Sequence, residues 1–470
     1  MRLVWLPGIF EAGIAITDDP DNGSFAHFKK IYDLLLTLHV LTSRAMWVFE
    51  PIEPTGTPPL NIRIWAPLLS DRECLNYCKE LHGEGFEICL HGASSGNNTR
   101  ERTVAALEFL EREIGPTRTF IFHSKNAENL YWDYKCAPSP LLSALVRLYS
   151  KNTCFGEVEG SKYFWGDICR SKISYSRLFR TRQLNTLEFN PSMPYHDFSM
   201  PYINYWFSAT KGYLARLFEP KAIDALCRQN GACVLYQYLH KYVDEKGKVD
   251  PRVRECLERV ALDSRILFSP VSALMDRLKQ FQLLQLAPYK GTALVINASK
   301  KPVDSVQLVL ESQESVGQSA HDGIDVIGHR AVIKSLQPLS VCQIFPSEET
   351  KIAPLENLKM YSEIAVIRFP LGIIVANCSP QPVAITDSFS RLSSEFPFLK
   401  RLEGFEVKVF YSTDEAQRLE ILSPISKTEL YRLFFGQAKI LLREHLFLGR
   451  KLSAAEYLEK PGKVEDQLNW

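Results

Sequence analysis

Ala12-Gly-Ile-Ala-Ile-Thr-Asp18-Asp19 is a short apolar run of β type that ends on two adjacent carboxylates. Neighbouring side chains at a strand end diverge, so one acid can hold a cation while the other stays free to act as a base. The structural alternative is a cap for the helix that follows Pro20, because Asp is favoured at helix starts. The pair alone does not decide between a metal-assisted hydrolytic site and a helix cap.

Length and composition indicate a globular protein with more than one domain. The chain has 470 residues, of which 46% are hydrophobic and 23% charged, and this length predicts two or three domains. Lys and Arg total 55 against 54 for Asp and Glu, so no net field attracts nucleic acid or anionic lipid, and we exclude both as partners. No stretch approaches the roughly 18 to 20 apolar residues of a membrane span.

Cysteine usage and the first residues indicate where the protein resides. The eleven cysteines are odd in number and lie in apolar runs, which favours a reducing compartment. Pro7, Glu11 and the Asp pair come before a signal-peptide core could form. Cys74 and Cys78 have no second Cys or His pair nearby, so we do not expect a zinc site there. The sequence predicts a cytoplasmic protein.

From residue 12 to about residue 285, short β-branched runs alternate with helical stretches, which predicts βα units around a parallel sheet. Several of these runs end on ionisable or metal-capable side chains. In a parallel α/β barrel the strand ends meet on one face, where functional sites are built. The pattern predicts one site that combines the Asp18–Asp19 pair with His91, His123 and His240.

Beyond about residue 286 the helical spacing stops, and short strand-like runs follow one another through polar turns. This texture is typical of an antiparallel β-sandwich of roughly a hundred residues. A mixed pattern over 386–470 includes an amphipathic helix over Leu430–Leu446. We therefore expect a barrel over 1–285, a sandwich over 286–385 and a mixed α/β segment over 386–470, with no internal repeat.

Four segments occur in an order that resembles the polysaccharide deacetylases with the NodB-type barrel, and the resemblance covers about residues 10–285. They are Thr17-Asp18-Asp19, the run Gly85-Phe-Glu-Ile-Cys-Leu-His91, the pair Leu239-His240, and the run from Pro270 to Leu278. The resemblance implies a distorted barrel of seven or eight βα units that removes N- or O-acetyl groups from glycans. It also implies a divalent metal, zinc or else cobalt, nickel or iron.

Roles carried over from the family fall on matching positions of this chain. The resemblance makes Asp18 the general base that activates water, Asp19 and His91 metal ligands, and His240 the general acid that protonates the leaving group. The chemistry is consistent, since a cation polarises a carbonyl and lowers the pKa of bound water, and a histidine donates protons near neutral pH.

The chain departs from the family pattern at two places. Where the family has a second ligand histidine, four residues after the first, this chain has Ser95. Ser95, Asn97, His123 or water would then complete the metal site, or the metal would be held weakly or not at all. His123 also stands where the family has an arginine, so its role does not carry over.

Residues 151–210 are irregular, long and rich in aromatic side chains. Aromatic faces stack on sugar rings, so part of this segment is a candidate sugar groove, and packing of a long loop against the barrel is the alternative. A basic cluster within the segment is expected to be solvated, or else to hold an acidic glycan or a phosphate-bearing lipid. The groove candidates are Trp165, Asp167, Tyr195, Asn204 and Trp206, and the basic cluster is Arg177, Arg180 and Arg182.

The leading hypothesis is a cytoplasmic metal-dependent hydrolase that deacetylates a polysaccharide or sugar intermediate. A barrel that has lost catalysis and binds glycan or scaffolds a polysaccharide pathway is the first alternative. A glycoside hydrolase is the second, although the two carboxylates of such an enzyme come from different strands rather than from one adjacent pair. The sequence leaves the sugar, the acyl group, the metal and the oligomeric state open.

Overall fold

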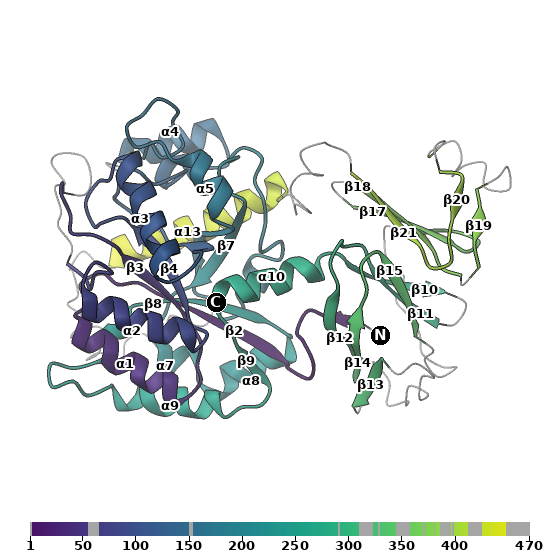
Figure 1. The fold of residues 1–470 in the computed structure, drawn as a ribbon, viewed down its shortest axis with the longest axis horizontal. Coiled ribbons are helices and arrows are strands. Elements are labelled where there is room, and N and C mark those ends of the chain that lie inside the picture. The colour runs from purple at the N-terminus through teal and green to yellow at the C-terminus, as the bar shows by residue number, and fades with distance from the viewer. Residues whose placement is uncertain are drawn as a thin grey trace.

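The computed structural model describes residues 2–54, 65–149, 154–289, 292–309, 323–327, 330–344, 358–369, 372–379, 381–385, 396, 399–411 and 425–447. Its larger part is a barrel of seven parallel strands, closed because β2 pairs with β8 on one side and with β3 on the other (Figure 1). The short strand β9 (Ile266–Phe268) adds to the first half of β2. The predicted (β/α) barrel is thereby confirmed. The barrel strands are β2 (Ala12–Asp18), β3 (Ser43–Trp47), β4 (Glu87–Gly92), β5 (Thr119–Phe120), β6 (Tyr175–Thr181), β7 (Tyr205–Thr210) and β8 (Ala232–Gln237).

Strand side chains alternate between the barrel interior and an outer helical layer. In β2, Ala15 belongs to the interior cluster, whereas Ile14 and Ile16 pack outward against helices. Trp5 and helix α10 (Val271–Phe281) fill the barrel end where β2 begins, and the candidate site lies at the opposite end. The outer helices include α1 (Phe25–Thr37), α2 (Arg72–Gly83), α3 (Arg100–Glu113), α4 (Pro140–Tyr149), α5 (Gly166–Lys172), α8 (Pro220–Arg228) and α9 (Pro251–Ala261).

The starts of the helices show which of the preceding polar residues act as N-caps. Helix α1 begins after Ser24, whose hydroxyl accepts from the backbone N–H of His27 at 3.1 Å. The Asp18–Asp19 pair is therefore not the cap of this helix. A cap residue followed by proline at Ser139-Pro140 predicts a helix start, and helix α4 begins there. Asn98 with Glu101 three residues on resembles a capping box, but Thr99 occupies the N-cap position of α3 and Asn98 bonds elsewhere.

Two barrel strands lie inside the segment that sequence analysis described as irregular. They are β6 and β7, and helix α5 precedes them. Strand β6 reads Tyr-Ser-Arg-Leu-Phe-Arg-Thr, so charged side chains interrupt the apolar run that marks a buried parallel strand. That interruption explains why β6 was not recognised.

The antiparallel part consists of two similar modules rather than one sandwich. In the first, the sheet β10-β11-β15 packs on the sheet β1-β12-β14-β13, and in the second, β16-β17-β18-β21 is joined by the pair β19-β20. Strand β11 is buried on both faces and also packs on β17 and β18. The bounds are β10 (Leu284–Tyr289), β11 (Thr292–Asn297), β12 (Val303–Val309), β13 (Ile324–Ile327), β14 (Arg330–Leu336), β15 (Ser340–Ile344), β16 (Leu358–Tyr361), β17 (Ile364–Phe369), β18 (Gly372–Asn377), β19 (Val383–Ala384), β20 (Arg401–Leu402) and β21 (Val407–Tyr411).

The two modules share a motif at one corner. The first reads Asn297-Ala-Ser-Lys-Lys-Pro-Val and the second Asn377-Cys-Ser-Pro-Gln-Pro-Val. In each, the Asn side-chain amide donates to the carbonyl four residues on, of Lys301 at 3.0 Å and of Gln381 at 2.7 Å. Each Asn side-chain oxygen also accepts from the backbone N–H two residues on. The chain therefore does contain an internal repeat, contrary to expectation.

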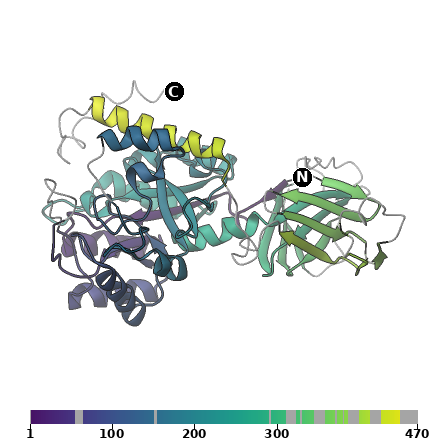
Figure 2. The ribbon, with the colours of Figure 1, turned by 90° about the horizontal axis from the view of Figure 1, so that it is seen from above.

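Both ends of the described chain cross the predicted domain boundaries. Strand β1 (Arg2–Val4) pairs with β12 in the first β module, not with the barrel. Helix α13 (Lys427–Phe447) returns to the barrel, where Leu433 and Phe434 join the outer core and Gln437 accepts from the backbone N–H of Arg180 at 2.9 Å. Figure 2 shows α13 along the barrel, away from the β modules. Residues 448–470 of the predicted last segment lie outside the described residues.

Two further expectations concern membranes and thiols. Within the described residues, no helix combines the length and the apolar character needed to cross a bilayer. All eleven cysteines are unpaired, and all except Cys342 are buried. Cys74 and Cys78 both lie in α2 on its buried side, so they are core thiols.

Candidate metal centre

Alternation along the strands determines which polar side chains enter the barrel. Ala15 of β2 and Cys89 of β4 face the interior. Asp19, four residues after Ala15, and His91, two residues after Cys89, therefore point to the same side. Both side chains are buried, and both lie where their strands end. The fold thus brings together two of the predicted ligands.

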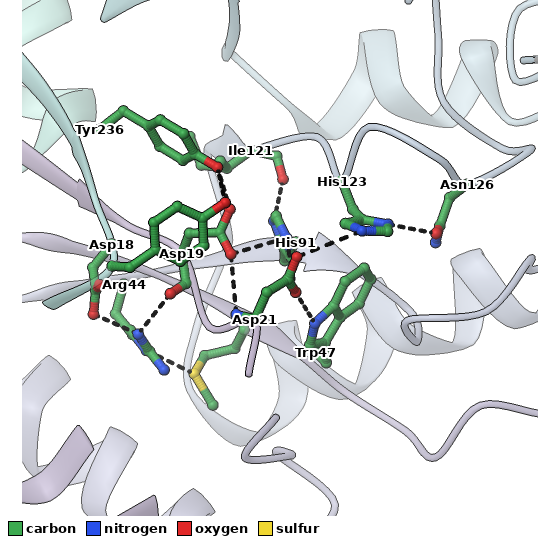
Figure 3. A network of polar contacts seen from close by, with 12 residues as sticks. Asp18, Asp19, Asp21, Arg44, Trp47, His91, Ile121, His123, Asn126 and Tyr236 are labelled. Carbon is green, nitrogen blue, oxygen red and sulfur yellow. Dashed lines mark hydrogen bonds and ion pairs between the residues drawn. The ribbon is translucent and has the colours of Figure 1, made fainter. Parts of the chain in front are cut away.

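Asp19, Asp21 and His91 form a buried cluster whose candidate ligand atoms all lie within 4.8 Å of one another. Nε2 of His91 lies 3.6 Å from Oδ1 of Asp19 and 3.6 Å from Oδ1 of Asp21 (Figure 3). The backbone N–H of Asp21 donates to Oδ1 of Asp19 at 3.0 Å, which holds the turn after β2 closed. Two carboxylates from one turn therefore face a histidine from another strand.

The hydrogen bonds of His91 fit a metal ligand. Its Nδ1 lies 2.5 Å from the carbonyl oxygen of Ile121, so Nδ1 carries a proton and donates it. Nε2 is buried and has no hydrogen-bond partner within the described part of the chain. A ligand histidine commonly donates its second ring N–H to a carbonyl or carboxylate in this way, which fixes the ring and directs the other nitrogen at the cation. These residues fit a divalent metal.

Two aromatic residues hold the carboxylates in place. The hydroxyl of Tyr236 donates to Oδ2 of Asp19 at 2.6 Å, and the indole N–H of Trp47 donates to Oδ1 of Asp21 at 3.0 Å. The Trp47 ring also lies edge-on to the His91 ring, with 4.4 Å between centroids. Partners of this kind orient ligands before a cation arrives.

His123 adds a second histidine beside the cluster. Its Nε2 lies 3.5 Å from Oδ2 of Asp21, and its Nδ1 lies 2.8 Å from Oδ1 of Asn126. Asn126 is held in turn by Glu128, whose Oε1 accepts from the Asn126 amide at 2.8 Å and from the Asn98 amide at 2.6 Å. A buried chain from Glu128 through Asn126 therefore orients the His123 ring.

Burial and neighbouring charges shift the pKa values of these groups. Burial alone would raise the pKa of Asp21, but the close contact with the His91 ring, with help from the charge of His123 and the hydrogen bond from Trp47, lowers it. Burial alone would lower the pKa of His91, but the charge of Asp19 and the contact with Asp21 raise it. A positive charge would therefore stabilise the two carboxylates, and either a proton on His91 or a metal ion can supply it.

Asp18 points the other way. As the neighbour of Asp19 on the strand, it faces the outer layer, where it forms an ion pair with Arg44 of β3 and accepts the backbone N–H of Leu239 at 2.7 Å. The Arg44 guanidinium also lies over the ring of Phe28 in α1, at 4.3 Å. The structure therefore does not bring Asp18 to the cluster as a base, because alternation turns it into the packing between strands and helices.

His240 lies in the short 3-10 helix Leu239–Tyr242, with its ring packed against Gly23. Burial, aided by the positive charge of Arg44, lowers the pKa of His240 to about 3. A histidine with that pKa is neutral at neutral pH and cannot donate a proton as an imidazolium ion. This environment does not suit the general-acid role that the resemblance implied.

Three of the five predicted groove residues belong to the packed layer outside the strands. Trp165, Tyr195 and Trp206 are fully buried in the outer core, and the indole N–H of Trp165 donates to the carbonyl of Glu128 at 2.7 Å. The remaining two have partners of their own. Asp167 forms an ion pair with Arg100 at 2.6 Å, and the Asn204 amide donates to the carbonyls of Arg170 and Ile173, at 2.7 Å each.

No family model matches the chain, and no curated protein matches its sequence. Among solved structures, a protein from Mycobacterium smegmatis provisionally assigned as a polysaccharide deacetylase aligns with 60% of this chain and 95% of its own, at 10% identity and a TM-score of 0.35. A glycoside hydrolase 29 family member from an unknown rumen bacterium aligns with 80% and 82%, at 11% identity and a TM-score of 0.31. These structural likenesses are distant.

Sequence analysis did not identify Asp21, and it named Ser95 at the position where the resemblance expects a second ligand histidine. Ser95 is buried in the loop after β4, where the carbonyls of its neighbours Ser94 and Gly96 accept from Asn126. The additional carboxylate comes instead from Asp21. The signal was present, since Asp-Asp-Pro-Asp places a third acid two residues after Asp19 and a proline turn brings it back towards the strand end.

Proposed function

We propose that the protein is a metal-dependent hydrolase that removes acetyl groups from a carbohydrate. One observation carries the proposal: Nε2 of His91 has no hydrogen-bond partner among the described residues and lies 3.6 Å from a carboxylate oxygen of both Asp19 and Asp21. Imidazole and carboxylate together suit zinc, iron, cobalt or nickel. When bound there, the cation would polarise a carbonyl and lower the pKa of water.

Residues of the chain supply orientation and proton transfer. Tyr236 and Trp47 fix the two carboxylates, so the cluster needs little rearrangement to bind a cation. Burial lowers the pKa of His123, which is therefore neutral at neutral pH. With Nδ1 turned to Asn126, its Nε2 is the atom that can accept a proton beside Asp21. His123 thus takes the role of general base that the resemblance gave to Asp18.

The reaction class rests on the sequence resemblance together with this cluster. The Thr-Asp-Asp strand end and the Gly-Phe-Glu-Ile-Cys-Leu-His strand are the segments that resemble polysaccharide deacetylases, and they supply Asp19 and His91. A glycosidase is less well supported, because its two carboxylates flank one glycosidic bond and come from separate elements. Asp19 and Asp21 instead share one turn and face one histidine.

Acetate release tests the proposal. Protein loaded with zinc, cobalt, nickel or iron would be incubated with a panel of N- and O-acetylated sugars and oligosaccharides. We expect release by the native chain, loss of release in His91→Ala and Asp21→Asn, and retention in His82→Ala, which removes an exposed histidine of α2. Absence of acetate from every metal and substrate, with glycan still bound, would instead support the barrel that has lost catalysis. New reducing ends would indicate a glycosidase.

A further inference from the structure

Arg177 places a positive charge inside the barrel. It lies in β6 two residues after Tyr175, which faces the interior, so alternation points Arg177 there too. Its side chain is buried, with 3% of its surface exposed. The expectation that the basic cluster containing Arg177 is a solvated surface is therefore wrong for this residue.

Two nitrogens of this guanidinium have no acceptor. Nε and Nη1 are buried and have no hydrogen-bond partner among the described residues. The face of the group lies over the Tyr236 ring, with 3.9 Å between the guanidinium carbon and the ring centroid. A ring face attracts the charge but does not replace acceptors for N–H groups. Buried donors without acceptors are rare, and an unplaced ion or ligand is one of their explanations.

Arg44 shows how the same chain treats another buried arginine. Its guanidinium lies over Phe28 and Tyr32, and it also has a carboxylate partner in Asp18. Among the described residues, Arg177 has the aromatic contact but no carboxylate in an ion pair with it. The difference is consistent with a counter-ion that a bound anion supplies to Arg177.

Arg177 adjoins the metal cluster through one side chain. Tyr236, whose ring lies under Arg177, donates its hydroxyl to Asp19. A group held by Arg177 would therefore lie close to a group reacting at Asp19, Asp21 and His91. Guanidinium groups bind carboxylates and phosphates through several charge-assisted hydrogen bonds.

We propose that Arg177 is an anion-binding subsite beside the metal cluster, and that the substrate is a carbohydrate carrying a carboxylate or a phosphate. The identification of the anion as part of a substrate rests on the proposed function, whereas binding of an anion by Arg177 does not depend on it. The subsite would select acidic over neutral acetylated sugars. The proposal rests on the burial of Arg177, on its two nitrogens without acceptors among the described residues, and on its position beside the metal cluster.

Anion binding to the full chain tests the subsite without an activity assay. Inorganic phosphate, glucuronate and neutral glucose would be titrated by calorimetry into the native chain, Arg177→Gln and Arg228→Gln, an exposed arginine of α8. The set would be repeated with His91→Ala, so that binding to a metal is separated from binding to Arg177. We expect at least about tenfold weaker anion binding in Arg177→Gln, no loss in Arg228→Gln, and no binding of glucose. Comparison of the phosphate and glucuronate affinities shows whether the subsite prefers a phosphate or a carboxylate group.

Equal anion affinity in the native chain and Arg177→Gln would overturn the proposal, as would absence of anion binding in the native chain. If Arg177→Gln does not fold, the native chain labelled with ¹⁵N-arginine provides the test. The Nε–H signal that is missing in Arg177→Lys must shift when anion is added, and a signal that does not move refutes the subsite. Anion binding without acetate release would support the subsite and reject the hydrolase. Acetate release that depends neither on the charge of the sugar nor on Arg177 would support the hydrolase and reject the subsite.

Discussion

Asp18 and Asp19 are neighbours in sequence, but they serve different parts of the molecule. Asp19 ends β2 on the interior side and faces His91, while Asp18 faces outward and pairs with Arg44. A single step along a strand separates the two environments. The sequence left open whether the pair caps a helix or acts in catalysis. In the structure the two residues differ, because Asp19 is a candidate metal ligand and Asp18 belongs to a structural ion pair.

Asp18→Asn is therefore expected to affect stability more than metal binding. It leaves Arg44 buried without its counter-ion, and breaking a buried ion pair in this way costs about 3 to 5 kcal/mol. Urea unfolding would measure the loss, and elemental analysis of the folded variant should find the same metal content as in the native chain. Loss of metal with native stability would return Asp18 to the site.

Glu128 is expected to make stability depend on pH. Burial raises its pKa from 4.5 to about 7 in the folded chain. Because the folded pKa is the higher one, its contribution is fully present below pH 4.5 and is lost as the pH rises through 7, by an amount on the order of 3 kcal/mol. Other groups also titrate in this range, so the measurement is the difference between native chain and Glu128→Gln.

Urea unfolding of Glu128→Gln at pH 5 and pH 8 should show a smaller decrease in stability with rising pH than the native chain shows. The exposed carboxylate of Glu255 in α9 supplies the control, and Glu255→Gln should follow the native chain. Parallel pH profiles for the native chain and Glu128→Gln would mean that Glu128 is not protonated on folding.

Among the elements, helix α13 shows how a distant segment can complete a domain. Leu433 is fully buried in the barrel's outer core, whereas Phe435, two residues on, is 53% exposed. We expect Leu433→Ala to destabilise the protein by about 2 to 5 kcal/mol and Phe435→Ala to cost much less. Thermal and urea unfolding would compare the two, and similar losses would contradict the docking of α13 on the barrel.

Prediction from sequence succeeded where the period of apolar residues was regular. The sequence pattern predicts a strand over Ile266–Phe268 and helices that begin at Pro140, near residue 220 and at Val271, and β9, α4, α8 and α10 lie at these places. It failed for β6, where Arg177 and Arg180 interrupt the apolar run, because the function of a charged side chain inside a barrel is not visible locally. The repeat around Asn297 and Asn377 is visible in the sequence, but it is short and its two copies lie 80 residues apart.

The site was predictable in part for the same reason. Asp19, His91 and His123 lie at or shortly after the ends of β2, β4 and β5, and parallel topology requires those ends to meet. Asp21 was missed because a turn, rather than a strand, brings it to the cluster. Trp165 and Trp206 were placed in a groove by residue type alone. Trp206 reaches the outer core through the alternation of β7, a strand that had not been recognised, and Trp165 reaches it from the N-cap position of α5.

At the scale of the whole molecule, the chain crosses between its parts more than once. It begins in the first β module with β1, forms the barrel, returns to both β modules and ends its described part on the barrel with α13. Arg277 of α10 ties these parts together, since its guanidinium donates to the carbonyl of Trp5 at 2.6 Å and to that of Asp304 at 2.7 Å. The barrel and the first module are thus joined by contacts as well as by the chain.

The central claim, that Asp19, Asp21 and His91 bind a divalent metal, is tested most directly by the metal content of the purified protein. Elemental analysis without chelator should find about one zinc, iron, cobalt or nickel ion per chain in the native protein and in His82→Ala, and almost none in His91→Ala or Asp21→Asn. A native protein without stoichiometric metal after reconstitution, or a His91→Ala variant that keeps it, would contradict the account.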